Sequence, residues 1–145
     1  MKFISHFKEL DKDSVQSSGG KGASLGEMTR AQIPVPAGFV VLTKAFEHFL
    51  HTSNLHSEID GILHKVDHQV IHTIDQASEQ IKGLIFAVPM PSEIEKEILT
   101  SFSSLNSPFV AVRSSATAED SSAAAWAGQL DSFLNTTKKD LLLNG

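Results

Sequence analysis

The chain has 145 residues, of which 41% are hydrophobic and 20% are charged, a balance typical of globular proteins. This length fits one domain or a piece of a larger one. Seventeen acidic against twelve basic side chains give a net charge of −5, which argues against wrapping nucleic acid or lying on an anionic membrane. Without cysteine, disulfide scaffolds, thiolate metal sites and cysteine nucleophiles are excluded.

The sequence begins without the apolar run of a signal peptide. No segment approaches the roughly 20 consecutive apolar residues that a membrane-spanning helix needs. We therefore expect a cytoplasmic protein with neither a membrane nor a nucleic acid as its partner.

The first third of the chain predicts short, mixed elements. Residues 1–17 are expected to form a short strand or loop anchored by four apolar side chains, Phe3, Ile4, Phe7 and Leu10. A Ser-Ser-Gly-Gly cluster at 17–20 predicts a break, followed by a helix over 23–31. The two prolines in 33–38 exclude a helix there, and the continuous apolar run 39–42 predicts a strand buried on both faces.

A helical stretch is predicted over about residues 44–103. Thr43 is a suitable N-cap for a helix to about Leu50. Apolar residues step by three or four over 55–85, which is long enough to predict two helices with a break near 67–73. A Ser-x-x-Glu pattern beginning at Ser92 indicates the start of a further helix.

Two strands are predicted after the helices, over 109–113 and 130–135. Helices combined with these strands predict an α+β (mixed α/β) domain.

The segment 19–28, GGKGASLGEM, is the first candidate site. Glycines before a helix leave N–H groups pointing at one spot, where the helix dipole favours an anion. Lys21 adds a mobile positive charge, so the pattern suits a phosphate. It is not a Walker loop, because Val15 and Gly22 replace required residues. The alternative is a glycine turn that caps a helix, with Lys21 in solvent.

The second candidate is Arg113 at the end of a predicted buried strand. A lone buried charge is costly, so the guanidinium must find an anion. Its planar fork matches two phosphate oxygens, and the hydroxyls of Ser114 and Ser115 add donors. The alternative is an internal salt bridge to Glu119 or Asp120.

The third candidate is the segment 123–132, in which small residues surround Trp126 and Gly128 precedes a strand. Such a segment suits a mobile cover whose backbone approaches phosphates closely. The alternative is a plain loop and hairpin. A zinc site at His64, His68 and His72 is weighed as well. Side chains spaced by four line up along a helix rather than converge, so a solvated face is favoured and no metal ligand is assigned.

Four motifs in the same order and spacing closely resemble the N-terminal, ATP-binding part of the phosphoenolpyruvate synthase (pyruvate, water dikinase) family. They are GGKGASLGEM at 19–28, VPAGF at 35–39, VAVRSSATAED at 110–120 and AGQLDSFLN at 127–135. The same module occurs in rifampin phosphotransferase and, more divergently, in pyruvate phosphate dikinase.

The resemblance implies an ATP-grasp-type nucleotide-binding domain, of which residues 1–145 are the N-terminal portion. It implies that ATP phosphorylates a carrier histidine on another domain, which then passes phosphate to pyruvate. Lys21 and Arg113 correspond to the residues that hold ATP phosphates and are the implied catalytic residues. The implied glycine-bearing loop over the phosphates contributes four further nucleotide contacts, Gly128, Gln129, Asp131 and Ser132.

The family's ATP domain is about twice as long as this chain, so the resemblance also implies missing parts. Mg²⁺ is an expected cofactor whose ligands lie outside this chain, as do the carrier-histidine domain and the remaining half of the ATP domain. We expect either an excised piece or a truncated gene product that is inactive alone. The alternatives are a piece of a rifampin phosphotransferase-type antibiotic kinase and a non-catalytic interaction module.

Overall fold

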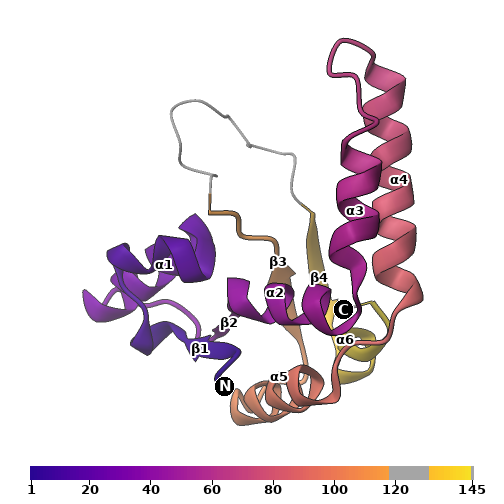
Figure 1. Ribbon diagram of the computed structural model, residues 1–145. Helices are drawn as coiled ribbons and strands as arrows, with labels where there is room; N and C mark the ends of the chain where they lie inside the picture. Colours follow the sequence, from indigo (N-terminus) through magenta and orange to yellow (C-terminus); the bar gives the residue numbers. More distant parts are fainter. Residues whose placement is uncertain (118–130, 145) are drawn as a thin grey trace. The chain divides into compact units, whose positions relative to one another are not determined.

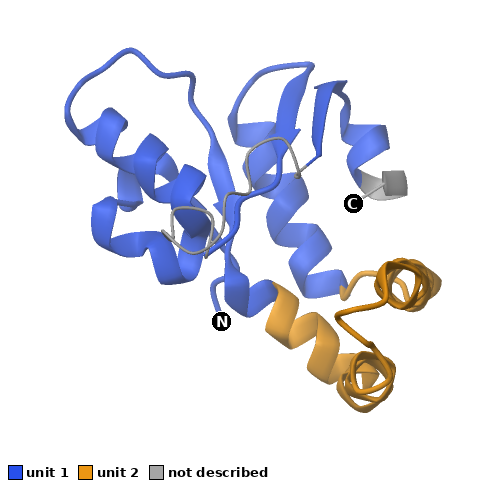
Figure 2. Ribbon diagram, turned by 90° about the horizontal axis from the view of Figure 1, so that it is seen from above, with its two compact units in different colours: residues 1–45, 92–145 blue, residues 46–91 orange. Residues whose placement is uncertain are grey.

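The structure, a computed structural model, describes residues 1–117 and 131–144 (Figure 1). The chain divides into two compact units (Figure 2). Unit 1 comprises residues 1–45 and 92–145, and unit 2 comprises residues 46–91. The strands that the structure describes all belong to unit 1, whereas unit 2 is built from helices.

Unit 1 begins with a short antiparallel ladder between β1 (Ile4–His6) and β2 (Phe39–Val41). Three of the predicted anchors, Phe3, Ile4 and Leu10, are each only 3% exposed. The predicted short strand at the start of the chain is therefore confirmed, and its apolar side chains form part of the core of unit 1.

The prediction that the apolar run 39–42 is buried on both faces is wrong. Phe39 and Val40 are half-buried and Val41 is 46% exposed. Among the described residues β2 pairs with β1 alone, so it lacks the layers that cover both faces of a central parallel strand. The apolar composition of residues 39–42 therefore did not determine whether one face or both faces of the strand are covered by other elements.

Two short 3₁₀ helices, η1 (Phe7–Glu9) and η2 (Lys12–Ser14), lead into helix α1 (Val15–Arg30). The predicted break at 17–20 lies inside this helix, because Gly19 has non-helical φ and ψ of 72° and 170°. The helix predicted over 23–31 is therefore the part of α1 that follows Gly19, and it ends at Arg30.

Close packing of α1 depends on its small residues. A Cβ added at Gly26 would lie 2.6 Å from a backbone atom of Leu10, so the residues before the helix are in direct contact with it. Thr43, at the start of α2 (Thr43–Thr52), donates through its hydroxyl to the Gln16 carbonyl at 3.3 Å.

Unit 2 contains α3 (Leu55–Leu63) and α4 (Ile71–Ala87), which contact each other, together with most of α2. The predicted break between the two long helices is confirmed at residues 64–70. All three histidines of the spaced set, His64, His68 and His72, are exposed. Within the described part of the chain, no group of three or more His, Cys, Asp or Glu side chains could hold a metal ion.

Helix α5 (Ser92–Ser104) returns the chain to unit 1. Its Glu97 carboxylate accepts the backbone N–H groups of Phe3 and Ile4, at 2.8 and 3.1 Å. A half-buried carboxylate thus joins α5 to the start of β1, since backbone donors removed from water need a partner.

A β-hairpin-like pair and a short helix complete unit 1. Strand β3 (Val110–Arg113) pairs antiparallel with β4 (Ser132–Thr136), and α6 (Lys138–Asn144) follows. Both predicted strands are confirmed. The result is the mixed α/β content that the sequence predicts, and none of the described helices is long and apolar enough to cross a membrane.

Candidate functional site

The kink of α1 lies against the segment that follows β3. We call residues 18–22 the glycine turn and residues 114–116 the strand-end segment. The Gly20 N–H donates to the Ala116 carbonyl at 3.1 Å, and the Gly22 N–H donates to Ser115 Oγ at 3.3 Å. Two candidate motifs that are far apart in the sequence are therefore in direct contact.

Gly19 permits this contact for two reasons. Its φ of 72° lies in the left-handed region, which residues with a Cβ rarely adopt. A Cβ at this position would also collide with Ser115 Oγ and lie 2.9 Å from Ser115 Cβ. The local sequence thus needs glycine here both for the backbone angle and for space.

Lys21 extends from the glycine turn to the end of β3. Its Nζ donates to the Ser114 carbonyl oxygen at 3.0 Å, although the two residues are 93 positions apart. Ser114 directly follows Arg113, the last residue of β3. The ammonium group therefore lies at the end of the strand that carries the predicted guanidinium.

Arg113 itself is exposed, so the prediction that it ends a buried strand is wrong. Side chains along β3 alternate between half-buried and exposed positions, and Arg113 occupies an exposed one. Within the described ranges no carboxylate forms an ion pair with it. The alternative partners Glu119 and Asp120 lie outside these ranges, and the exposed guanidinium can meet a ligand that arrives from solvent.

Strand β4 and the residue before it bring two predicted nucleotide contacts next to β3. Ser132 lies opposite Arg113 in the antiparallel register. The Asp131 carbonyl accepts both the N–H and the hydroxyl of Ser114, at 3.3 and 3.0 Å. The structure thus brings Asp131 and Ser132 beside the strand that carries Arg113, whereas the predicted contacts Gly128 and Gln129 lie outside the described residues.

Two predictions about donors at this site are wrong. The glycine segment is predicted to leave N–H groups free for an anion, but those of Gly20 and Gly22 donate to the strand-end segment. The hydroxyls of Ser114 and Ser115 were expected to donate to phosphate, but each donates its single proton to a protein carbonyl. The cause is the close approach of the two motifs, whose donors and acceptors form hydrogen bonds with one another.

Sequence reasoning missed the contact between Ser18 and Ser115. Ser115 Oγ donates to the Ser18 carbonyl at 3.0 Å across 97 positions. Ser18 itself is only 3% exposed. The small residues in both motifs permit such an approach, but they do not identify the partner.

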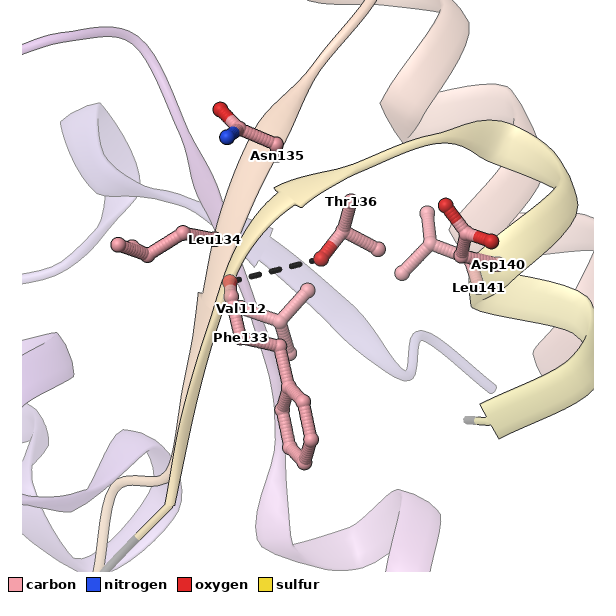
Figure 3. Close-up of a pocket in the computed structure, with 7 residues that line it drawn as sticks. All are labelled: Val112, Phe133, Leu134, Asn135, Thr136, Asp140 and Leu141. Carbon is pink, nitrogen blue, oxygen red and sulfur yellow. Dashed lines mark hydrogen bonds between the residues drawn. The ribbon is translucent and has the colours of Figure 1, made fainter.

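A separate cavity of about 200 Å³ lies between β4 and α6, lined mostly by apolar side chains (Figure 3). Phe133 and Leu134 contribute to its lining, and the Thr136 hydroxyl donates to the Phe133 carbonyl at 3.4 Å. None of the predicted nucleotide contacts that the structure describes lines it. The cavity is therefore lined by the hairpin and α6, and neither Lys21 nor Arg113 contributes to it.

Comparison with known proteins identifies the class to which this arrangement belongs. Residues 15–144 match the family described as pyruvate phosphate dikinase, AMP/ATP-binding domain, and the chain belongs to this family. This match includes the glycine turn, β3 and β4, so the contacting motifs all lie within the family domain.

Among individual proteins, the chain is similar to phosphoenolpyruvate synthases. It is 40% identical over 141 residues to a probable phosphoenolpyruvate synthase of Methanothermobacter thermautotrophicus, covering 93% of this chain and 21% of that protein. The corresponding protein of Methanocaldococcus jannaschii is 42% identical over 93% of this chain and 12% of its own length. The phosphoenolpyruvate synthase of Helicobacter pylori is 38% identical over 99% of this chain and 19% of its own. The chain thus spans about a fifth or less of these relatives.

Proposed function

We propose that this chain is the ATP-binding part of a cytoplasmic phosphoenolpyruvate synthase-like dikinase. In that enzyme, ATP would phosphorylate a carrier histidine on another domain, and the histidine would pass phosphate to pyruvate. Family membership supports the nucleotide, and the names of the relatives support the reaction. We further propose that residues 1–145 are the N-terminal portion of an ATP-grasp-type domain, with its helical part at about 44–103.

One observation carries the site assignment: the Lys21 ammonium lies at the end of the strand that carries Arg113. Lys21 and Arg113 would hold the ATP phosphates, and a segment containing Gly128, Gln129, Asp131 and Ser132 would cover them. Phosphoryl transfer is catalysed mainly by positioning and by neutralising charge, so an ammonium at the end of β3 and an exposed guanidinium on the last residue of that strand are suitable groups.

Mg²⁺ would accompany ATP and take its protein ligands from polypeptide outside this chain. Oxygen ligands, chiefly carboxylates, suit Mg²⁺. The described residues contain no cluster of three or more candidate ligands, and Asp131 is the predicted nucleotide contact that carries a carboxylate. The remaining half of the ATP domain and the carrier-histidine domain would complete the enzyme, and the chain alone would not turn over.

The proposal predicts specific losses of ATP binding. Lys21→Ala and Arg113→Ala should each weaken ATP binding by roughly 10- to 100-fold, because each removes a charge-assisted hydrogen bond of about 1.5–3 kcal/mol. Binding of ATP to the 145-residue chain is measured by calorimetric titration in the presence of Mg²⁺. In the longer enzyme, the same two variants should abolish ATP-dependent phosphorylation of the carrier histidine.

Lys82→Ala is the matched control, because Lys82 is an exposed lysine of α4 that pairs with Glu79 at 3.5 Å. It should bind ATP as the parent chain does, and all variants should retain their circular dichroism spectra. Parent-like affinity in both Lys21→Ala and Arg113→Ala would remove the assignment of the site.

A further inference from the structure

Ser115 makes two hydrogen bonds, one to a residue before Lys21 in the sequence and one to a residue after it. Its hydroxyl donates to the Ser18 carbonyl at 3.0 Å and accepts the Gly22 N–H at 3.3 Å. The next residue, Ala116, accepts the Gly20 N–H at 3.1 Å. The backbone is therefore attached to the strand-end segment on both sides of Lys21.

The surroundings of Ser115 leave little freedom for this contact to shift. Ser18 is buried, and Gly19 has no side chain where a Cβ would collide with Ser115 Oγ. A displacement of the glycine turn would leave the Gly22 amide and the Ser18 carbonyl without their partner, which is costly because both residues are buried. The Ser115 hydroxyl consequently fixes the origin of the Lys21 side chain.

We propose that Ser115 is a positioning residue that holds Lys21 at the end of β3, beside Arg113. The inference has two parts. The docking part, that Ser115 holds the glycine turn against the strand-end segment, does not depend on the proposed function. The nucleotide part, that this contact strengthens ATP binding through Lys21, rests on the proposed function. Ser115 does not donate to the phosphate, because its one hydroxyl proton is already given to Ser18. Its effect on ATP is transmitted through Lys21.

The docking part is tested by hydrogen exchange on the 145-residue chain without nucleotide. Ser115→Ala should accelerate exchange of the Gly22 amide by about tenfold, since its acceptor is removed. The matched control is Ser107→Ala, which also loses a hydroxyl bonded to a backbone carbonyl, that of Phe109 at 2.6 Å, but lies before β3. It should leave Gly22 unchanged. Unchanged exchange of Gly22 in Ser115→Ala would overturn the docking role.

The nucleotide part is tested by a double-mutant cycle with ATP and Mg²⁺. Ser115→Ala should weaken ATP binding by about three- to tenfold in the parent chain, as expected for loss of one hydrogen bond. In the Lys21→Ala background the same change should have no further effect, because Lys21 transmits it. Ser115→Thr, which keeps the hydroxyl, should stay within about twofold of the parent.

The outcomes separate this inference from the proposed function. If Lys21→Ala weakens ATP binding and Ser115→Ala does not, the positioning role is overturned while the ATP site stands. The same loss from Ser115→Ala in both backgrounds would also overturn it, because the effect would not pass through Lys21. A loss in Ser115→Thr as large as in Ser115→Ala would overturn the role of the hydroxyl. If Lys21→Ala does not change ATP binding, the proposed ATP site is wrong. Hydrogen exchange of the Gly22 amide then decides by itself whether Ser115 holds the glycine turn.

Discussion

Single residues decide whether the two motifs of the site can touch. Gly19 supplies a backbone angle that other residues avoid, and its missing side chain leaves room for Ser115. Lys21 then reaches the carbonyl of Ser114. The chemistry proposed for the site therefore depends on a residue that carries no functional group.

Gly19→Ala should destabilise unit 1 by roughly 2 kcal/mol or more, since it adds left-handed strain to a collision with Ser115. Gly83→Ala is the opposite case. Gly83 lies inside α4, and a Cβ added there would meet no described atom within 4 Å apart from the backbone of its own helix. It should stabilise its helix by about 0.5–1 kcal/mol. Urea unfolding followed by circular dichroism measures both, and equal stability of Gly19→Ala and the parent would contradict the structure.

Among the elements, α6 shows how a short helix begins. The Asp140 carboxylate accepts the N–H and the hydroxyl of Thr137 at 2.9 and 2.6 Å, and the Thr137 hydroxyl also accepts the Asp140 N–H at 3.3 Å. These bonds satisfy donors that the first turn of a helix cannot pair internally. The Thr137 hydroxyl, followed by its backbone N–H, lowers the pKa of Asp140 below its ordinary value of 3.8.

Because this pKa is lowered by folding, the stabilisation from Asp140 is fully present above the ordinary pKa and is lost as pH falls through the lowered one. Thr137→Ala should raise the pKa of Asp140 toward 3.8 and shift the loss of helical signal in α6 to higher pH. Carboxyl-carbon NMR titration measures the change. Asp11, whose pKa is lowered chiefly by the Ser14 hydroxyl, is an internal reference that should not move.

At the scale of the whole molecule, apolar side chains remain on the surface of the hairpin in unit 1. Phe133 is 56% exposed and Leu134 is 73% exposed. They are successive residues of β4, and both also contribute to the lining of the cavity beside α6. Exposed apolar side chains on a two-stranded ladder form a surface that further polypeptide can cover, such as the remaining half of the ATP domain that we propose.

We expect the 145-residue chain to self-associate through this hairpin when its proposed complement is absent. Leu134→Thr should reduce association while changing the free energy of unfolding by no more than about 0.5 kcal/mol, because the side chain is exposed. Light scattering coupled to size exclusion, over a series of concentrations, measures the association. A parent chain that stays monomeric throughout would contradict this expectation.

Several elements could be predicted from the sequence because their signals are local. Periodic apolar residues predicted the pair of helices around the break at 64–70. The apolar run before Arg113 predicted β3, and alternating residues predicted β4. The exposure of Arg113 could not be predicted in this way. Apolar neighbours along a strand do not reveal whether other layers cover them.

The sequence by itself determined the mixed α/β class and the family, since both follow from residue patterns along the chain. It also placed a lysine after paired glycines and an arginine at a strand end. Only the tertiary structure decided that the Lys21 ammonium meets the end of β3 and that the serine hydroxyls and glycine amides satisfy one another. The reason is physical: a hydrogen bond between residues more than 90 positions apart depends on how the chain folds back, and no local pattern encodes its partner.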